Sequence, residues 1–161
     1  MQQVNLHQQK LIALLIAGVA FISLLLNWSA PKGFGGFIQA SSQNGFHSWG
    51  LLSLLGILGV IVASVLGNKM RPFEGQTKQI AMGSFGIAAL GAIIYLLRLL
   101  TGSQDTGFGS IKFSDIAKPG VGLYLCLVLA IAGLAWVYGL IKMPVMPAHS
   151  PTPPPPPPPT A

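Results

Sequence analysis

The chain has 161 residues, of which 52% are hydrophobic and only 7% are charged. A soluble domain carries about 25% charged residues, so this composition excludes a water-soluble globular protein and favours one whose solvent is lipid. The formal net charge is +6, but the basic residues are scattered singly, without a basic stripe or an aromatic platform. We therefore exclude nucleic acid as a partner.

Four long apolar runs predict an all-α membrane protein, a four-helix transmembrane bundle. The predicted helices cover residues 11–28, 49–67, 80–100 and 121–141. A spanning helix needs about 20 residues, and these runs hold no acidic residue or histidine. The first run also resembles a signal peptide, but bulky Trp28 stands in the candidate cleavage site where a small residue is needed. We therefore expect an uncleaved helix.

The chain divides into three parts. A polar N-terminal segment (1–10) precedes the transmembrane domain (11–142), and a Pro-rich tail (143–161) follows it. The tail contains the proline run 153–159, which predicts an extended polyproline II segment because proline lacks the backbone donor. Such tails act either as spacers or as ligands of aromatic-lined grooves, and both interpretations stay open.

The basic residues also predict the orientation in the membrane. The densest basic cluster is "NKMRPFEGQTK" (68–78), in the short loop between the second and third helices. Cytoplasmic loops carry an excess of Lys and Arg, so we expect this loop and both termini in the cytoplasm. Asp105 and Asp115 then lie on the outer side.

The two predicted outer loops resemble each other. The first contains "GFGGFIQAS" (33–41) and the second "GFGSIKFSD" (107–115). The similarity indicates two duplicated helical hairpins related by a two-fold axis along the membrane normal; the alternative is that Gly and Phe are simply common in such loops. Aromatic residues among Gly and Ser predict short β-like segments here, or side chains that dip into the membrane interface.

Two further patterns concern packing. Trp28 and Trp49 bracket the first outer loop, so we expect both tryptophans to anchor the chain at the membrane interface. Small residues recur at helical spacing, which is typical of tight contacts between membrane helices. The predicted packing residues are Gly59, Ala63, Gly67, Ser84, Ala88, Ala92, Ala135 and Gly139.

Arg98 is the only charged residue within the four runs. One interpretation is that its long side chain reaches the outer interface and anchors the loop. The other is that it points into the bundle, where it binds a lipid phosphate or pairs with Asp105 or Asp115. Tyr95, one turn earlier, would support either arrangement. We treat these four residues as a candidate lipid or ion-pair site.

No catalytic or metal-binding pattern is present. His7, His47 and His149 all lie outside the runs, and Cys126 is the only cysteine. These residues have none of the spacings that a metal site or a disulfide requires. We expect no enzyme activity, no cofactor and no metal.

Several short motifs carry a resemblance. "LLNW" (25–28) ends the first helix, "NGFHSWGLL" (44–52) begins the second, a Tyr/Arg pair ends the third, and "PGVGLYL" (119–125) begins the fourth. This pattern resembles a set of small, uncharacterised bacterial four-helix membrane proteins, in which a Leu-Pro-Trp-like motif ends helix 1; Asn27 replaces that proline. The resemblance implies a four-helix fold in a bacterial cytoplasmic membrane and no activity. The layout is similar to claudin-like proteins by analogy only, because the loop cysteine pair is absent.

Together these patterns favour a non-enzymatic integral membrane protein, a structural or accessory subunit of a homo-oligomer or larger membrane complex. Its expected partners are membrane lipids and other membrane subunits or itself. The alternative is a small transporter or channel subunit that uses Arg98 with the polar residues Asn27, Ser23, Ser53 and Ser84. An enzyme acting on lipid is a third hypothesis, disfavoured because the helices lack acids and histidines.

Overall fold

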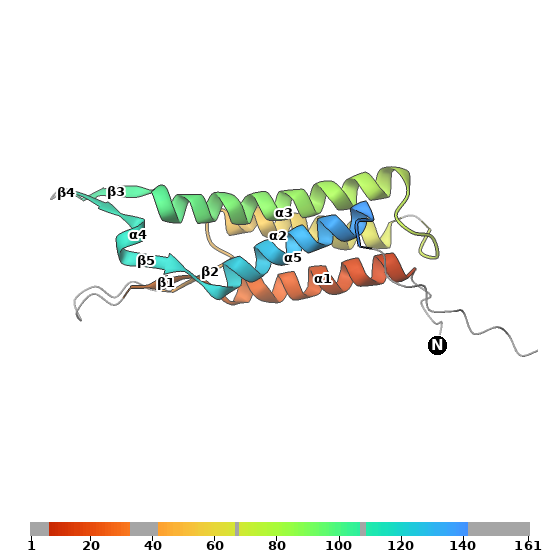
Figure 1. The fold of residues 1–161 in the computed structure, drawn as a ribbon, viewed down its shortest axis with the longest axis horizontal. Coiled ribbons are helices and arrows are strands. Elements are labelled where there is room, and N and C mark those ends of the chain that lie inside the picture. The colour runs from red at the N-terminus through yellow and green to blue at the C-terminus, as the bar shows by residue number, and fades with distance from the viewer. Residues whose placement is uncertain (1–6, 33–41, 67, 107–108, 142–161) are drawn as a thin grey trace, which may run out of the picture.

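The computed structural model describes residues 7–32, 42–66, 68–106 and 109–141. The described chain is mostly helical (Figure 1). Its long helices are α1 (Gln8–Leu25), α2 (Gly50–Val65), α3 (Gly75–Thr101) and α5 (Val121–Tyr138). Helices α1, α3 and α5 are long and apolar enough to cross a membrane, whereas α2 is a shorter apolar helix of 16 residues.

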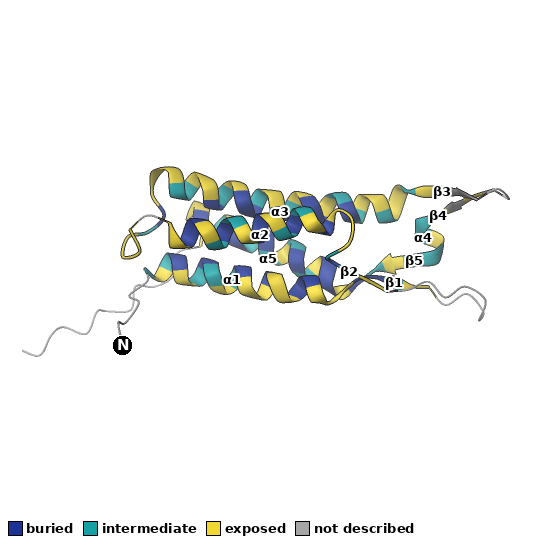
Figure 2. Ribbon diagram, turned by 180° about the vertical axis from the view of Figure 1, so that it is seen from behind, coloured by how far each residue is buried: buried dark blue, intermediate teal, exposed yellow. Residues whose placement is uncertain are grey.

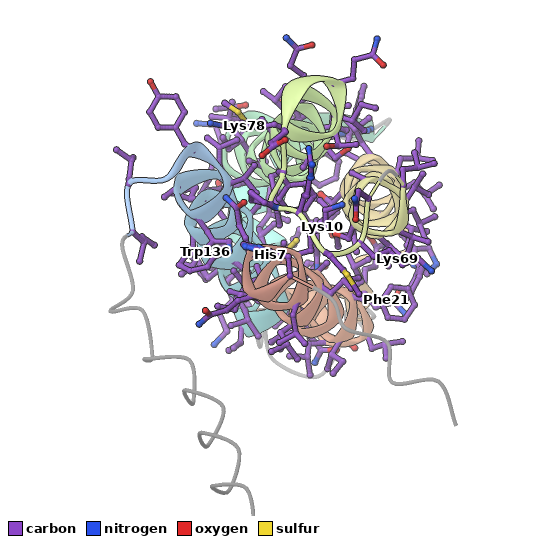
Figure 3. The ribbon with its side chains drawn as sticks, turned by 90° about the vertical axis from the view of Figure 1, so that its right-hand side faces the viewer. His7, Lys10, Phe21, Lys69, Lys78 and Trp136 are labelled. Atoms are coloured by element: carbon purple, nitrogen blue, oxygen red, sulfur yellow. The ribbon has the colours of Figure 1, made fainter. Side chains whose placement is uncertain are left out.

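The four long helices lie side by side in one bundle. Helix α1 packs against α2 and α5, and α3 packs against the same two helices, so the order around the bundle is α1, α2, α3, α5. The view along the bundle axis shows this ring (Figure 3). Helices α2 and α3 approach most closely where Gly56 faces α3: a Cβ there would lie 2.5 Å from the backbone nitrogen of Ala88.

The connections at one end of the bundle form small sheets, as predicted. The short elements are β1 (Asn27–Pro31), β2 (Gln43–Asn44), β3 (Ser103–Thr106), β4 (Gly109–Lys112), α4 (Phe113–Ile116) and β5 (Ala117–Pro119). Strand β1 is central in the order β2-β1-β5, and β3 pairs with β4 as a separate antiparallel hairpin. We call this end, marked by β1, β2 and β5, the sheet end (Figure 1).

Strand β1 corrects the predicted end of the first helix. Helix α1 ends at Leu25, three residues early, and Asn27–Pro31 pairs with β5 through Ser29 opposite Pro119 and Ala30 opposite Lys118. The sequence pattern misses this because an apolar run has the same composition in a helix and in a short buried strand. The long-range pairing with β5 decides between them.

The two connections at the sheet end are built differently. Strand β1 pairs with β2 of its own connection and with β5 of the other, whereas β3 pairs only with β4. The segments that prompted the duplication hypothesis, 33–41 and part of 107–115, lie wholly or partly outside the described residues. The duplication stays a prediction, without matching strand pairing to support it.

Helix α3 begins at Gly75, five residues before its apolar run. A capping box explains the early start: the Glu74 side chain accepts from the backbone of Thr77, and the Glu74 backbone N–H donates to Thr77 Oγ1 at 3.3 Å. The first turns of α3 are therefore polar. Apolar periodicity alone does not locate such a start, because capping depends on Ser, Thr and Glu residues.

The end of the bundle opposite the sheets holds both ends of the described chain. We call it the lysine end, after Lys10, Lys69 and Lys78 (Figure 3). The backbone N–H of His7 donates to Lys69 O at 2.9 Å, and Trp136 Nε1 donates to Gln9 O at 3.0 Å. These bonds join the start of α1 to the α2–α3 connection and to the end of α5.

Buried residues lie on the inner faces of the helices, and exposed residues lie on their outer faces (Figure 2). Among the described residues, the interior holds many alanines and five buried serines, of which Ser53 Oγ donates to Ala88 O at 2.9 Å. Large apolar side chains such as Leu15, Leu55 and Val128 point outward and are exposed. Among the described residues, every buried side-chain nitrogen and oxygen has a hydrogen-bond partner.

Candidate functional site

The sheet end is closed by Trp28, which has 0% exposure. Its indole Nε1 donates to Ser23 O at 3.0 Å, and the Gly45 N–H donates to Leu24 O at 2.8 Å. Both acceptors belong to the last turn of α1, where backbone carbonyls have no partner within the helix. Trp28 therefore caps α1, and it is not the interface anchor that the sequence predicted, because the tight sheet pairing draws its ring inside.

Trp49 differs from Trp28 in its environment. It is 42% exposed and precedes the first residue of α2 as the N-cap. This position is compatible with the predicted interface anchor. The two tryptophans that bracket the same loop thus have different roles: one fills the interior, and the other faces outward.

A pocket of about 270 Å³ opens beside Tyr95 at the sheet end. Its polar lining is Gln43, Ser48 and Arg98, and its apolar lining is Tyr95, Leu99 and Phe113. The pocket thus brings together residues from β2, from the turn before α2, from the last turns of α3 and from α4. Segments far apart in the sequence meet here because β2 and α4 both lie at the C-terminal end of α3.

Arg98 is the cation of this pocket. Its side chain is exposed, and Nη1 donates to Ser48 Oγ at 3.4 Å, a long hydrogen bond. Among the side chains that the structure describes, no carboxylate forms an ion pair with Arg98. The charge is therefore directed to the pocket and to solvent, away from the bundle interior.

The structure describes the side chain of only one of the two predicted acidic partners. Asp115 is an exposed residue on α4 and does not pair with Arg98. Asp105 lies on β3 opposite Ser110, and its side chain is outside the described part of the chain. For Asp115 the expected ion pair is thus wrong, because α4 places Phe113, not the carboxylate, against the end of α3.

Tyr95 forms the rigid wall of the pocket. It is 6% exposed, and its ring meets that of Trp28 edge to face, with centroids 5.2 Å apart. Phe113 forms the facing wall: its N–H donates to Gly102 O, and a Cβ on Gly102 would lie 2.6 Å from the Phe113 ring. The walls are therefore set by packing before any ligand enters.

The predicted packing residues lie in several environments. Ala63, Ser84, Ala88 and Ala92 are buried, and Gly59 lies against Ser84, whose Oγ would be 2.4 Å from an added Cβ. Ala135 is half-buried, and Gly67 lies outside the described residues.

Gly139 requires a correction. It lies beyond α5 as its C-cap, exposed, with φ +94°. Its N–H donates to Ala135 O at 3.1 Å, and the next residue, Leu140, donates to the same carbonyl at 3.0 Å. Glycine adopts this left-handed conformation without strain and commonly ends helices in this way. Gly139 therefore terminates the helix and does not pack between helices.

Lys10 is the second notable cation, and the sequence analysis assigned it no role. It is 1% exposed; Nζ donates to Leu66 O and Asn68 O, each at 3.1 Å, and lies 5.6 Å from the centre of the Phe73 ring. It caps the C-terminal end of α2, where a positive charge is favourable. The only signal in the sequence is a lysine immediately before an apolar run, which does not distinguish this cap from an ordinary flanking charge.

Gln43, Ser48 and Phe113 were also missed as site residues. Ser48 and Phe113 lie within the segments 44–52 and 107–115, but those patterns predict no binding role. Each of the three residues enters the pocket only through the folding of the connections. Within the described ranges, no three His, Cys, Asp or Glu side chains gather as a metal site requires.

No protein-family model, curated protein or solved structure matches this chain. The resemblance to small bacterial four-helix membrane proteins therefore stays a prediction, carried by the short motifs alone.

Proposed function

We propose that the chain is a non-enzymatic integral membrane protein: a four-helix transmembrane bundle that serves as a structural or accessory subunit. Its assembly is either a homo-oligomer or a larger membrane complex. The observation that supports this proposal is that large apolar side chains lie on the outer surface of the bundle. All four long helices expose large apolar residues, while the interior combines alanines and serines with large apolar side chains such as Leu24, Ile57 and Phe85.

The exposed apolar surface supports lipid as the solvent. Soluble monomers rarely expose apolar patches beyond a few hundred Å². Here the exposed large apolar residues recur along the length of each helix; they include Leu11, Leu15, Ile22, Leu51, Leu55, Val62, Leu90, Leu97, Tyr124, Val128 and Ile131. In lipid, close approach of backbones through small residues and interhelical hydrogen bonds stabilise such a bundle. The contact of Ser53 with Ala88 O is of this kind.

Helix α2 is included in the proposed transmembrane bundle although it is short. Its 16 residues rise about 24 Å, somewhat less than a hydrocarbon core of about 30 Å. Exposed Trp49 and Leu66 flank it and extend its apolar length. A mismatch of this size has a modest cost, because the local bilayer thins or flanking residues reach the interface.

The proposed orientation places the lysine end in the cytoplasm of a bacterial cell. Lys69 and Arg71 are exposed there, and the ends of α1 and α5 lie together at this end. The sheet end, with Arg98, then faces outward. This follows the rule that cytoplasmic loops carry the excess of basic residues.

The alternative of a transporter or channel subunit receives less support. Arg98 is exposed at the surface of the sheet end. Below it, the interior contains the fully buried side chains of Trp28, Leu24 and Leu123. A polar pathway would need to pass this apolar layer. Replacement of Arg98 by Gln would abolish flux under that alternative and leave the assembly intact.

The first experiment is the mass of the particle purified in a mild detergent from its native membrane. We expect the protein to stay with membranes after an alkaline wash and to run above the mass of one chain, as a homo-oligomer or with other subunits at fixed ratio. A single chain, both in detergent and after cross-linking in intact membranes, would overturn the subunit role. Release by the alkaline wash would overturn the membrane placement.

The orientation is tested with a matched pair of single-cysteine variants in a Cys126→Ser background. Gln76→Cys lies at the start of α3 near the lysine end, and Lys118→Cys lies on β5 at the sheet end; both positions are exposed. A membrane-impermeant maleimide added to intact cells should label Lys118→Cys and leave Gln76→Cys unlabelled until the cells are lysed. The reverse pattern would invert the topology.

A further inference from the structure

We propose that the sheet-end pocket lined by Gln43, Ser48, Tyr95, Arg98, Leu99 and Phe113 binds a phosphate group, supplied by a phospholipid headgroup. The recognition of phosphate follows from the pocket itself. The lipid source rests on the membrane placement proposed above.

Arg98 supplies the positive charge for this site. A guanidinium presents several N–H donors in a fixed plane and binds phosphate oxygens through two parallel hydrogen bonds. Among the side chains that the structure describes, its hydrogen-bond partner within the pocket is Ser48 Oγ, through the long contact. Most of its donors therefore remain available for an anion.

Two neutral donors share the pocket with Arg98. The Ser48 hydroxyl and the Gln43 amide line it from two further segments. A tetrahedral phosphate offers oxygens in several directions, so it accepts from three segments at once more readily than a planar carboxylate does. We therefore favour phosphate over a carboxylate as the bound group.

Ser48 has an unusual backbone. Its φ is +56°, and it is the only residue other than glycine with positive φ in the described part of the chain. This left-handed conformation is strained for serine but not for glycine. Such strained residues cluster at ligand sites. The strain here holds a hydroxyl beside Arg98, where the contact with Nη1 is made.

The size and the walls of the pocket suit a headgroup. Its volume of about 270 Å³ lies just below the usual range of about 300–1,000 Å³ for pockets that enclose whole small molecules. Tyr95, Leu99 and Phe113 form its apolar sides. Exposed Leu97 and Leu100 lie next to Arg98 on α3, so acyl chains continuing from a bound headgroup would meet apolar surface.

The charges around the site favour an anion. Besides Arg98, the sheet end carries Lys32, Lys112 and Lys118, against the two carboxylates of Asp105 and Asp115. Lys32 Nζ donates to Ser114 O and so ties the first connection to α4. Lys112 and Lys118 are exposed and do not line the pocket, which makes Lys112 a matched control for Arg98.

The test measures binding to the purified full-length protein in a neutral maltoside detergent. The probes are short-chain phosphatidylglycerol, glycerol phosphate, inorganic phosphate and, as an uncharged lipid, short-chain diacylglycerol. The readouts are the shift of the thermal unfolding midpoint with probe concentration and the lipids retained in native mass spectrometry. A ligand that binds the folded state raises the midpoint as its concentration increases.

We expect phosphatidylglycerol to bind, and Arg98→Gln to weaken this binding at least about ten-fold, as expected for a lost charged hydrogen bond. Lys112→Gln, which removes the same charge nearby, should change it little. Ser48→Gly should also weaken binding while the folded protein gains stability, because it removes the hydroxyl and relieves the strain.

Three outcomes would overturn the proposal. They are equal binding of diacylglycerol, equal weakening by Arg98→Gln and Lys112→Gln, or binding of none of the phosphate probes. Tight binding of inorganic phosphate or glycerol phosphate alone would keep the phosphate site and overturn the lipid source. The alkaline wash described above tests the membrane placement separately, so the two failures are distinguishable.

Discussion

The two ends of the bundle use a cation in opposite ways. At the lysine end, Lys10 is buried, and its ammonium is bound by two backbone carbonyls and an aromatic ring. At the sheet end, Arg98 is exposed and makes one long hydrogen bond to a serine hydroxyl. The first charge is part of the fold, and the second is available to a ligand.

The difference follows from how each end satisfies its helix carbonyls. Helix α2 ends at the lysine end, and Lys10 donates to Leu66 O, in its C-cap residue, and to Asn68 O, just beyond it. Helix α1 ends at the sheet end, where the Trp28 indole donates to Ser23 O. Because an uncharged indole performs the capping there, Arg98 is not needed for it. The role of a charged side chain near the end of an apolar helix can therefore be assigned only once its backbone carbonyl partners are known.

The largest expected effect is that of Trp28→Ala. This change empties the space beside Tyr95 and removes the donor to Ser23 O, so we expect a loss of about 3–5 kcal/mol in the free energy of unfolding. Thermal unfolding followed by circular dichroism in detergent measures it. Trp49→Ala, at the exposed tryptophan of the same connection, should cost far less. Equal losses would show that Trp28 does not have the buried role described here.

Lys10→Met should have the next largest effect. Methionine fills a similar volume but leaves Leu66 O and Asn68 O without their donor, so we expect a loss of about 2 kcal/mol, typical of hydrogen bonds to a charged group. The control is Lys69→Met, an exposed lysine at the same end, measured in the same unfolding assay. If both variants unfold like the original protein, the capping role of Lys10 is wrong.

Trp136→Phe tests the link between α5 and α1 at the lysine end. The ring keeps most of its packing, but the hydrogen bond from Nε1 to Gln9 O is lost. We expect a loss of about 1 kcal/mol. Hydrogen exchange of the first turns of α1 should also become faster, and unchanged exchange there would argue against this link.

Arg98→Gln should change stability least, within about 0.5 kcal/mol, as for an ordinary surface substitution. The same variant should lose phosphate binding, so the two measurements together separate a binding residue from a structural one. A destabilisation as large as that of Lys10→Met would mean that both ends use their cation structurally, and the comparison of the two ends would fail.

Much of the helical architecture is predictable from local pattern. The runs 80–100 and 121–141 lie largely within α3 and α5, and the short β-like segments are present at the sheet end. Only two of the six residues that line the pocket were predicted: Arg98 and Tyr95 lie one turn apart on α3, which helical periodicity reveals. Ser48, Gln43 and Phe113 join them through β2, the turn before α2 and α4, and no local pattern places these segments together.

The sequence by itself determined the apolar helices and the position of a charge near the end of α3, because composition and periodicity are local properties. Only the tertiary structure decided that Trp28 is buried and Trp49 exposed, that Lys10 is a cap, and that Arg98 faces a pocket. The physical reason is that burial and capping depend on which carbonyls and rings are nearby. For Lys10 those partners are Leu66 and Asn68, distant in the chain. Trp28 caps the nearby Ser23 carbonyl, but the Tyr95 ring that it contacts and the strand β5 that pairs with its own strand come from distant segments.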